Sequence, residues 1–176
     1  MSSLKLLGVV LSNTLKWDDN TDYICNKARR KIWLIRNMKL SGLTESELVD
    51  AFKKEIRSLL ELAVPVWHGT TTKAQSEQIE RIQKSATAAI LGPKFTSYED
   101  ALKSLKLQRL SERRTQICIK FIEKNMKSEC PLLSLVNKTQ HTRSASQQVQ
   151  EFFCRTQAFF DSSLPFLAKL CNQKFK

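Results

Sequence analysis

The sequence predicts a mostly α-helical protein: a helical bundle with a short N-terminal β-strand or hairpin and a loosely ordered C-terminal tail. Glycine and proline are scarce, with four of each among 176 residues, which disfavours a loop-rich or all-β fold. Hydrophobic residues make up 41% of the chain, enough to build a core and to argue against wholesale disorder. Apolar residues recur every three or four positions over most of the length, which is the helical period.

The first expected element is a β-strand or hairpin within residues 4–11, where the sequence reads Leu-Lys-Leu-Leu-Gly-Val-Val-Leu. Gly8 interrupts this run, and a glycine inside a strand pattern indicates a bulge or a close approach of two backbones. Because a single strand cannot complete its own hydrogen bonds, we expect it to need a partner from elsewhere.

A basic helix is expected next, from about residue 19 to 39. Its apolar stripe consists of Ile24, Ala28, Ile32 and Ile35, which recur at helical spacing. Its start is rich in aspartate, at Asp18, Asp19 and Asp22. Carboxylates at this end complement the helix dipole.

Four further helices follow from local start and stop signals. Thr44 and Glu47 form a capping box that opens a helix expected to continue until Pro65 ends it. A third helix is expected from about residue 73 to residue 91, where Gly92 and Pro93 stop it. Ser97 is expected to cap a short helix that begins at residue 98 and holds Leu102 and Leu105. Ser111 is expected to cap another over residues 112 to about 127.

These elements suggest four segments. Residues 1–17 form the strand, and residues 18–136 form one helical domain. Residues 137–151 are polar, lack apolar periodicity and are expected to form a linker. Residues 152–176 form an apolar tail with a short helix ending near Cys171.

The charge is the strongest bulk signal. The chain carries 29 Lys and Arg against 17 Asp and Glu, a formal charge of +12, and such a surplus suits a polyanionic partner. The candidate phosphate-contacting residues are Lys27, Arg29, Arg30, Lys31, Arg36 and Lys39. The alternative is that this run is only the solvated face of a helix. Basic residues recur on the later helices, and this favours phosphate contact over a merely solvated face.

Other chemistry-bearing residues give weaker signals. The Asp18-Asp19 pair resembles a polymerase metal-binding pair only superficially, since no aromatic residue stands at position 16 and no further carboxylate lies upstream. His68 has no nucleophile at a motif spacing. The five cysteines contain no C-x-x-C pair, so buried thiols in a reducing, intracellular compartment are expected rather than zinc. Nucleus and cytoplasm are not distinguished, and no cofactor is indicated.

The three tryptophans, Trp17, Trp33 and Trp67, either stack on bases or pack in the core. Core packing is favoured for Trp67 because its neighbours are apolar. Trp33 stays ambiguous. No apolar run approaches the ~20 residues of a membrane-spanning helix, so no membrane partner is expected.

Several blocks of the chain carry a family resemblance. The opening phrase, residues 6–18, reads Leu-Leu-Gly-Val-Val-Leu-Ser-Asn-Thr-Leu-Lys-Trp-Asp. Residues 60–67, 79–86, 90–92, 102–107 and 110–114 continue in a matching order and spacing, as do residues 154–156 and 164–167. Together these blocks resemble the region that follows the palm in reverse transcriptases of non-LTR retrotransposons of the jockey/LINE type.

This resemblance implies a C-terminal fragment of an RNA-directed DNA polymerase, with a palm-end strand followed by a thumb-like helical region. The thumb-like region would hold RNA or an RNA–DNA hybrid through its backbone. The fingers and the palm, with its catalytic carboxylates, would be lost partners, so we expect no catalysis by this chain. The alternative is a non-catalytic helical remnant or a protein-interaction module with no nucleic-acid role.

Overall fold

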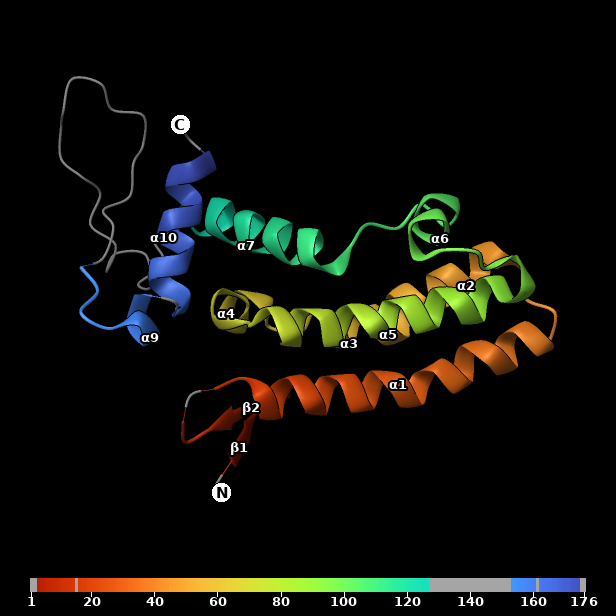
Figure 1. Ribbon diagram of the computed structural model, residues 1–176, viewed down its shortest axis with the longest axis horizontal. Coiled ribbons are helices and arrows are strands. Elements are labelled where there is room, and N and C mark those ends of the chain that lie inside the picture. Colours follow the sequence, from red (N-terminus) through yellow and green to blue (C-terminus); the bar gives the residue numbers. More distant parts are fainter. Residues whose placement is uncertain (1–2, 15, 127–152, 161, 175–176) are drawn as a thin grey trace. The chain divides into compact units, whose positions relative to one another are not determined.

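The computed structural model describes residues 3–14, 16–126, 153–160 and 162–174 (Figure 1). These residues are mostly helical, with one two-stranded antiparallel sheet at the N-terminus, which confirms the predicted fold class. They form two compact units. The first comprises Met1–Leu62 and Thr71–Arg113, and the second comprises Ala63–Thr70 and Arg114–Lys176. The segment 18–136 therefore contributes helices to both units, and the expected linker, 137–151, lies outside the described residues.

The N-terminal run is a hairpin and not a lone strand. Strand β1 (Ser3–Leu6) pairs with β2 (Val9–Ser12), so that Leu4 faces Leu11. The turn residues Leu7 and Gly8 have φ values of 47° and 88°, and positive φ at both central residues is the requirement of a type I′ turn. The expectation that the strand needs a partner from elsewhere was therefore wrong, because the turn lets the chain pair with itself.

Gly8 lies in the hairpin turn, and what approaches it is a side chain and not the second backbone that the sequence predicted. A Cβ atom at this position would lie 2.9 Å from Cδ2 of Leu62. The hairpin is also tied to the first helix, since the backbone N–H of Val10 donates to Oδ1 of the buried Asn20 at 3.0 Å.

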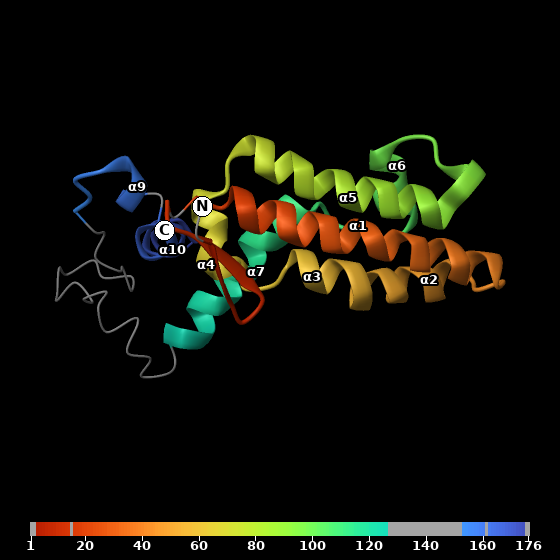
Figure 2. The same cartoon turned by 90° about the horizontal axis from the view of Figure 1, so that it is seen from below.

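Helix α1 (Asp18–Leu40) is the longest helix of the first unit, at 23 residues. Its apolar stripe is buried as predicted. It packs against α5 (Lys73–Leu91) and against the row formed by α2 (Glu45–Phe52), the π-helical turn η1 (Lys53–Arg57) and α3 (Ser58–Leu60). Figure 2 shows α1 in front of these two neighbours, so one face is buried between them and the opposite face is turned outward.

The row α2–η1–α3 departs from the prediction. Its capping box at Thr44 and Glu47 is present, but the helical run ends at Leu60 instead of continuing to Pro65. Ala63, in the left-handed conformation with φ of 51°, turns the chain, and Pro65 lies in the first turn of α4 (Val64–Trp67). A proline is well tolerated there because the first turn has no intrahelical acceptor for its missing N–H.

Helix α5 has the bounds that the sequence predicted. Thr72 caps it through a box with Gln75, and Gly92, with φ of 61°, ends it before the 3₁₀ turn η3 (Gly92–Lys94). Helix α6 (Tyr98–Ser104) starts at the predicted cap, Ser97. Helix α7 (Leu110–Met126) begins before Ser111, so that serine is a first-turn residue and not the cap.

The second unit contains α4, the 3₁₀ turn η2 (His68–Thr70), most of α7, and the helices α9 (Gln157–Phe160) and α10 (Ser163–Lys174). Trp67 is fully buried in this unit, as predicted, and α10 contacts α4. The hydroxyl of Ser163 donates to the carbonyl oxygen of Val66. The short helix expected near Cys171 is thus present and extends to Lys174.

Candidate nucleic-acid interface

The candidate site is the outward-facing side of α1. With 3.6 residues per turn, positions three and four apart lie next to one another on a helix surface. Arg29, Trp33, Arg36 and Leu40 follow this spacing, on the side opposite the buried stripe. We call the exposed residues of this side the outer face of α1; it comprises Arg29, Arg30, Trp33, Arg36 and Leu40. Lys27 comes nine residues before Arg36 and therefore projects from the opposite side of the helix.

Four of the six predicted basic residues have exposed side chains. Arg29, Arg30 and Arg36 lie on the outer face, and Lys27 lies on another side of the helix. None of the four forms an ion pair with any residue that the structure describes. Arg29 donates only a weak hydrogen bond to Oδ1 of Asn26, one turn earlier, at 3.2 Å. These four positive charges are therefore available to an external anion.

The other two predicted residues are engaged inside the first unit. The ammonium of Lys31 forms an ion pair with the carboxylate of Glu55 on η1. Lys39 donates to the carbonyl oxygen of Ile90 at 2.6 Å and approaches that of Ala89 at 3.4 Å. Both acceptors lie in the last turn of α5, where carbonyls lack intrahelical partners. Lys31 and Lys39 thus fasten α1 to its neighbours.

Trp33 lies among the arginines of the outer face. Its side chain is 66% exposed, and Leu40, two turns further along, is 86% exposed. The sequence left Trp33 ambiguous between packing and stacking, and the structure places it on the surface. A single exposed apolar side chain is ordinary on proteins, but this indole has an arginine four residues before it, another three residues before it and a third three residues after it.

A second cationic cluster, which the sequence did not single out, lies where the hairpin meets α1. The Nζ atoms of Lys5 and Lys27 lie 4.6 Å and 5.9 Å from the centroid of the Tyr23 ring. The hydrogen bond from Lys5, followed by the charges of both lysines, lowers the pKa of the Tyr23 phenol. Both side chains are exposed, so this cluster is a second positive patch, separate from the outer face.

Basic residues on the later helices divide into two groups. In the first unit, the carboxylate of Glu61 accepts hydrogen bonds from Nε of Arg113 at 2.6 Å and from Nη2 of Arg113 at 3.1 Å. Nε of Arg57 lies 3.9 Å from Oε1 of Glu61. These arginines serve the fold. The exposed basic residues of the same unit that form no ion pair with a described residue include Lys54, Arg81 and Lys84.

The second unit contains a different cluster, around His68. The His68 ring meets Phe166 edge-on at 5.6 Å, and its Nε2 lies 3.3 Å from Oγ1 of Thr115. Burial, followed by the charge of Arg114, lowers the pKa of His68 to about 4. Burial also raises the pKa of Cys118 to about 12. Neither group is held in the state that a Cys–His nucleophilic pair needs, which is a thiolate beside an imidazolium.

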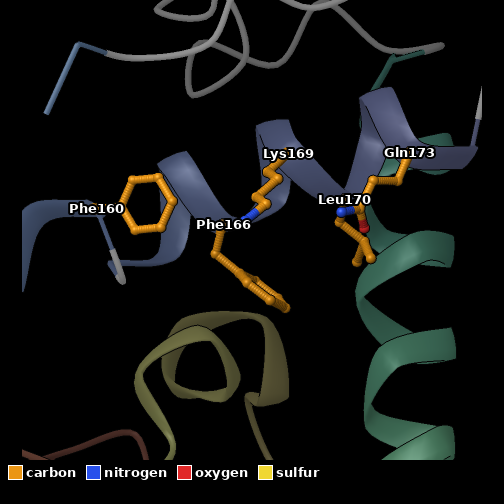
Figure 3. Close-up of a pocket in the computed structure, with 5 residues that line it drawn as sticks. All are labelled: Phe160, Phe166, Lys169, Leu170 and Gln173. Atoms are coloured by element: carbon orange, nitrogen blue, oxygen red, sulfur yellow. The ribbon is translucent and has the colours of Figure 1, made fainter. Parts of the chain in front are cut away.

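A shallow pocket of about 240 Å³ also lies in the second unit (Figure 3). Five residues of α9 and α10 line it: Phe160, Phe166, Lys169, Leu170 and Gln173. The Nζ atom of Lys169 lies 5.0 Å from the centroid of the Phe160 ring. The polar side-chain groups that line the pocket are the ammonium of Lys169 and the amide of Gln173. These two groups do not form a catalytic set.

The aspartates at the start of α1 hold the first unit together. Nε2 of Gln75 donates to Asp18 at 2.6 Å, and Nε2 of Gln78 donates to Asp22 at 2.7 Å. Both glutamines lie in the first two turns of α5. Across the described ranges, no group of three or more His, Cys, Asp or Glu residues is placed to hold a metal ion.

Within the part of the chain that the structure describes, no helix has both the length and the apolar character to cross a membrane. Comparison of the chain with known protein families, with curated proteins and with solved structures gives no match.

Proposed function

We propose that this chain binds nucleic acid through the outer face of α1, chiefly by contacts to phosphates. One observation carries the proposal: Arg29, Arg30 and Arg36 are exposed on one side of a long helix, and none forms an ion pair with a described residue. Lysine and arginine that neutralise phosphates release condensed counterions, which drives binding without reading sequence. The formal charge of +12 supports the same partner class.

The family resemblance leads to a more specific form of the proposal. The chain is a C-terminal, thumb-like region of a jockey/LINE-type reverse transcriptase, which holds RNA or an RNA–DNA template–primer and performs no catalysis itself. A thumb of this kind needs a rigid helix that presents cations to a backbone. Helix α1 meets this need because its opposite face is buried against α5 and the α2–η1–α3 row.

The test is fluorescence anisotropy of a labelled RNA–DNA primer–template, titrated with the full chain at salt concentrations from 50 to 200 mM. Three phosphate contacts predict a loss of affinity of about 20-fold on a single strand and about 40-fold on a duplex over this range. The variant Arg29→Gln/Arg30→Gln/Arg36→Gln should reduce the slope of log affinity against log salt by about 2 to 3.

The matched control is Lys54→Gln/Arg81→Gln/Lys84→Gln, which removes the same charge from exposed positions on η1 and α5. It should leave the slope nearly unchanged. An equal reduction by both triple variants would assign binding to the net charge and not to α1. If the folded protein fails to bind at 50 mM salt, the proposal is wrong, and the alternative of a helical protein-interaction module takes its place.

A further inference from the structure

The outer face of α1 contains one residue that phosphate binding does not explain. Trp33 is 66% exposed and follows Arg29 by four residues and Arg30 by three, while Arg36 comes three residues later. At these spacings the three arginines, together with Asn37 four residues later, are its neighbours on the helix surface. The described part of the chain supplies no ring or cation–π contact to this indole.

The chemistry of this arrangement distinguishes between nucleic-acid partners. In a duplex, the bases are stacked on one another, and a helix that binds the backbone meets sugars and phosphates, for which arginine suffices. In a single strand, each base offers a flat π-face. Surfaces that combine a row of cations with an exposed aromatic ring hold the strand by both contacts, and each stacked base contributes ~1–3 kcal/mol.

We propose that Trp33 stacks on an unpaired base, so that the outer face of α1 prefers single-stranded nucleic acid to duplex. This inference rests on the proposed function and deepens it, because it names the strand state that the face recognises. On a primer–template, the contact would fall on the unpaired template strand next to the duplex. The arginines fix the position of the nucleic-acid backbone, and Trp33 determines the preference for a single strand over a duplex.

The test compares four labelled ligands at constant salt: a 20-nucleotide single-stranded RNA, its blunt RNA–DNA duplex, the primer–template, and a single strand of abasic sites with the same phosphates. The proteins are the full chain, Trp33→Leu, Trp33→Phe and the control Leu40→Ala, which removes an exposed apolar side chain from the same face. Trp33 is exposed, so these substitutions should leave the circular dichroism spectrum and the unfolding midpoint unchanged.

We expect Trp33→Leu to weaken binding of the single-stranded RNA by roughly 5- to 150-fold, which corresponds to the stacking energy of one base. Trp33→Phe should retain part of the affinity, and Leu40→Ala should retain nearly all of it. On the blunt duplex and the abasic strand, Trp33→Leu should change the affinity less than twofold. Tryptophan emission should be quenched by the RNA in the unmodified chain and much less in Trp33→Leu.

Two outcomes separate this inference from the proposed function. If the chain binds nucleic acid with the predicted salt slope but Trp33→Leu affects all ligands equally or none, the stacking role is overturned and phosphate binding stands. If the unmodified chain binds none of the four ligands at 50 mM salt, both proposals fail. Tighter binding to vesicles with anionic headgroups than to RNA, lost in Trp33→Leu, would reassign Trp33 to a membrane surface.

Discussion

The Nζ atom of Lys39 lies 2.6 Å from the carbonyl oxygen of Ile90, so a side chain near the end of α1 completes the C-terminus of α5. An ammonium at this end of a helix satisfies an orphan carbonyl and complements the dipole. We expect Lys39→Met to lower the free energy of unfolding by about 1–2 kcal/mol, measured by urea denaturation. Lys27→Met removes an exposed lysine of the same helix and should lower the free energy of unfolding far less. Equal losses of stability in the two variants would contradict the role of Lys39 at the end of α5.

The contact between Gln75 and Asp18 links two helix starts. Oε1 of Gln75 accepts from the backbone N–H of Thr72 at 2.9 Å, and its Nε2 donates to Asp18 at 2.6 Å. Gln75→Glu keeps the capping acceptor but places a second carboxylate against Asp18. The free energy of unfolding at pH 7 should fall by about 1 kcal/mol. Adding Asp18→Asn should restore most of it, whereas no recovery would mean that the two side chains do not interact.

Glu61 joins residues that are far apart in the sequence. Its two oxygens accept from Arg113 at 2.6 and 3.1 Å, and this hydrogen bonding raises the pKa of the guanidinium. A double-mutant cycle with Glu61→Gln and Arg113→Gln should give a coupling energy of about 1–2 kcal/mol. The exposed pair of Glu45 and Lys94, at 2.7 Å, should couple more weakly because solvent screens it. Similar coupling energies for the two pairs would contradict the claim that burial strengthens the pair of Glu61 and Arg113.

His68 should make the stability of the second unit depend on pH. Its pKa in the folded chain is lowered to about 4 from its ordinary value of 6.5, so between these values the unfolded chain binds more protons than the folded one. Stability is therefore highest above pH 6.5 and falls as the pH is lowered towards 4. From pH 7 to pH 5 the loss should be on the order of 2 kcal/mol, absent in His68→Gln. An NMR titration midpoint for His68 near 6.5 would refute this.

The hairpin turn offers a stabilising substitution. Leu7 adopts a positive φ and is 92% exposed, a conformation that costs most L-residues energy and that asparagine tolerates. Leu7→Asn should stabilise the hairpin by up to about 1 kcal/mol, seen as slower amide exchange at the hydrogen-bonded positions of β1 and β2. Gly8→Ala should have the opposite effect, because its Cβ would meet Leu62. Faster exchange in Leu7→Asn would rule out the proposed strain.

The predictability of the helices depended on whether their boundaries were set locally. The expected bounds of helix α5, about residues 73–91, agree with the structure because local signals set both ends: Thr72 caps its start, and Gly92 with Pro93 stops it. The row α2–η1–α3 was predicted too long. The row contains a π-helical turn and ends before the left-handed Ala63. Neither feature can be predicted from the spacing of apolar residues.

The sequence predicted which helix carries the candidate site, but not which of its residues belong to the site. Charge and spacing identified the basic run of α1, including Arg29 and Arg36. They did not reveal that Lys31 pairs with Glu55 or that Lys39 reaches Ile90, because both partners are brought near only by tertiary packing. The exposure of Trp33 was undetermined for the same reason, since a tryptophan at helical spacing fits a core as well as a surface.

The order of the two units along the chain limits how the protein can be divided. Ala63–Thr70 belongs to the second unit although it lies between helices of the first. A truncation after Arg113 would leave Trp67 and Val64, both buried in the second unit, without the α7 and α10 residues of that unit. Limited proteolysis or domain dissection should therefore yield no independently folded N-terminal half, and a shortened chain that ends at Arg113 should aggregate through the uncovered indole.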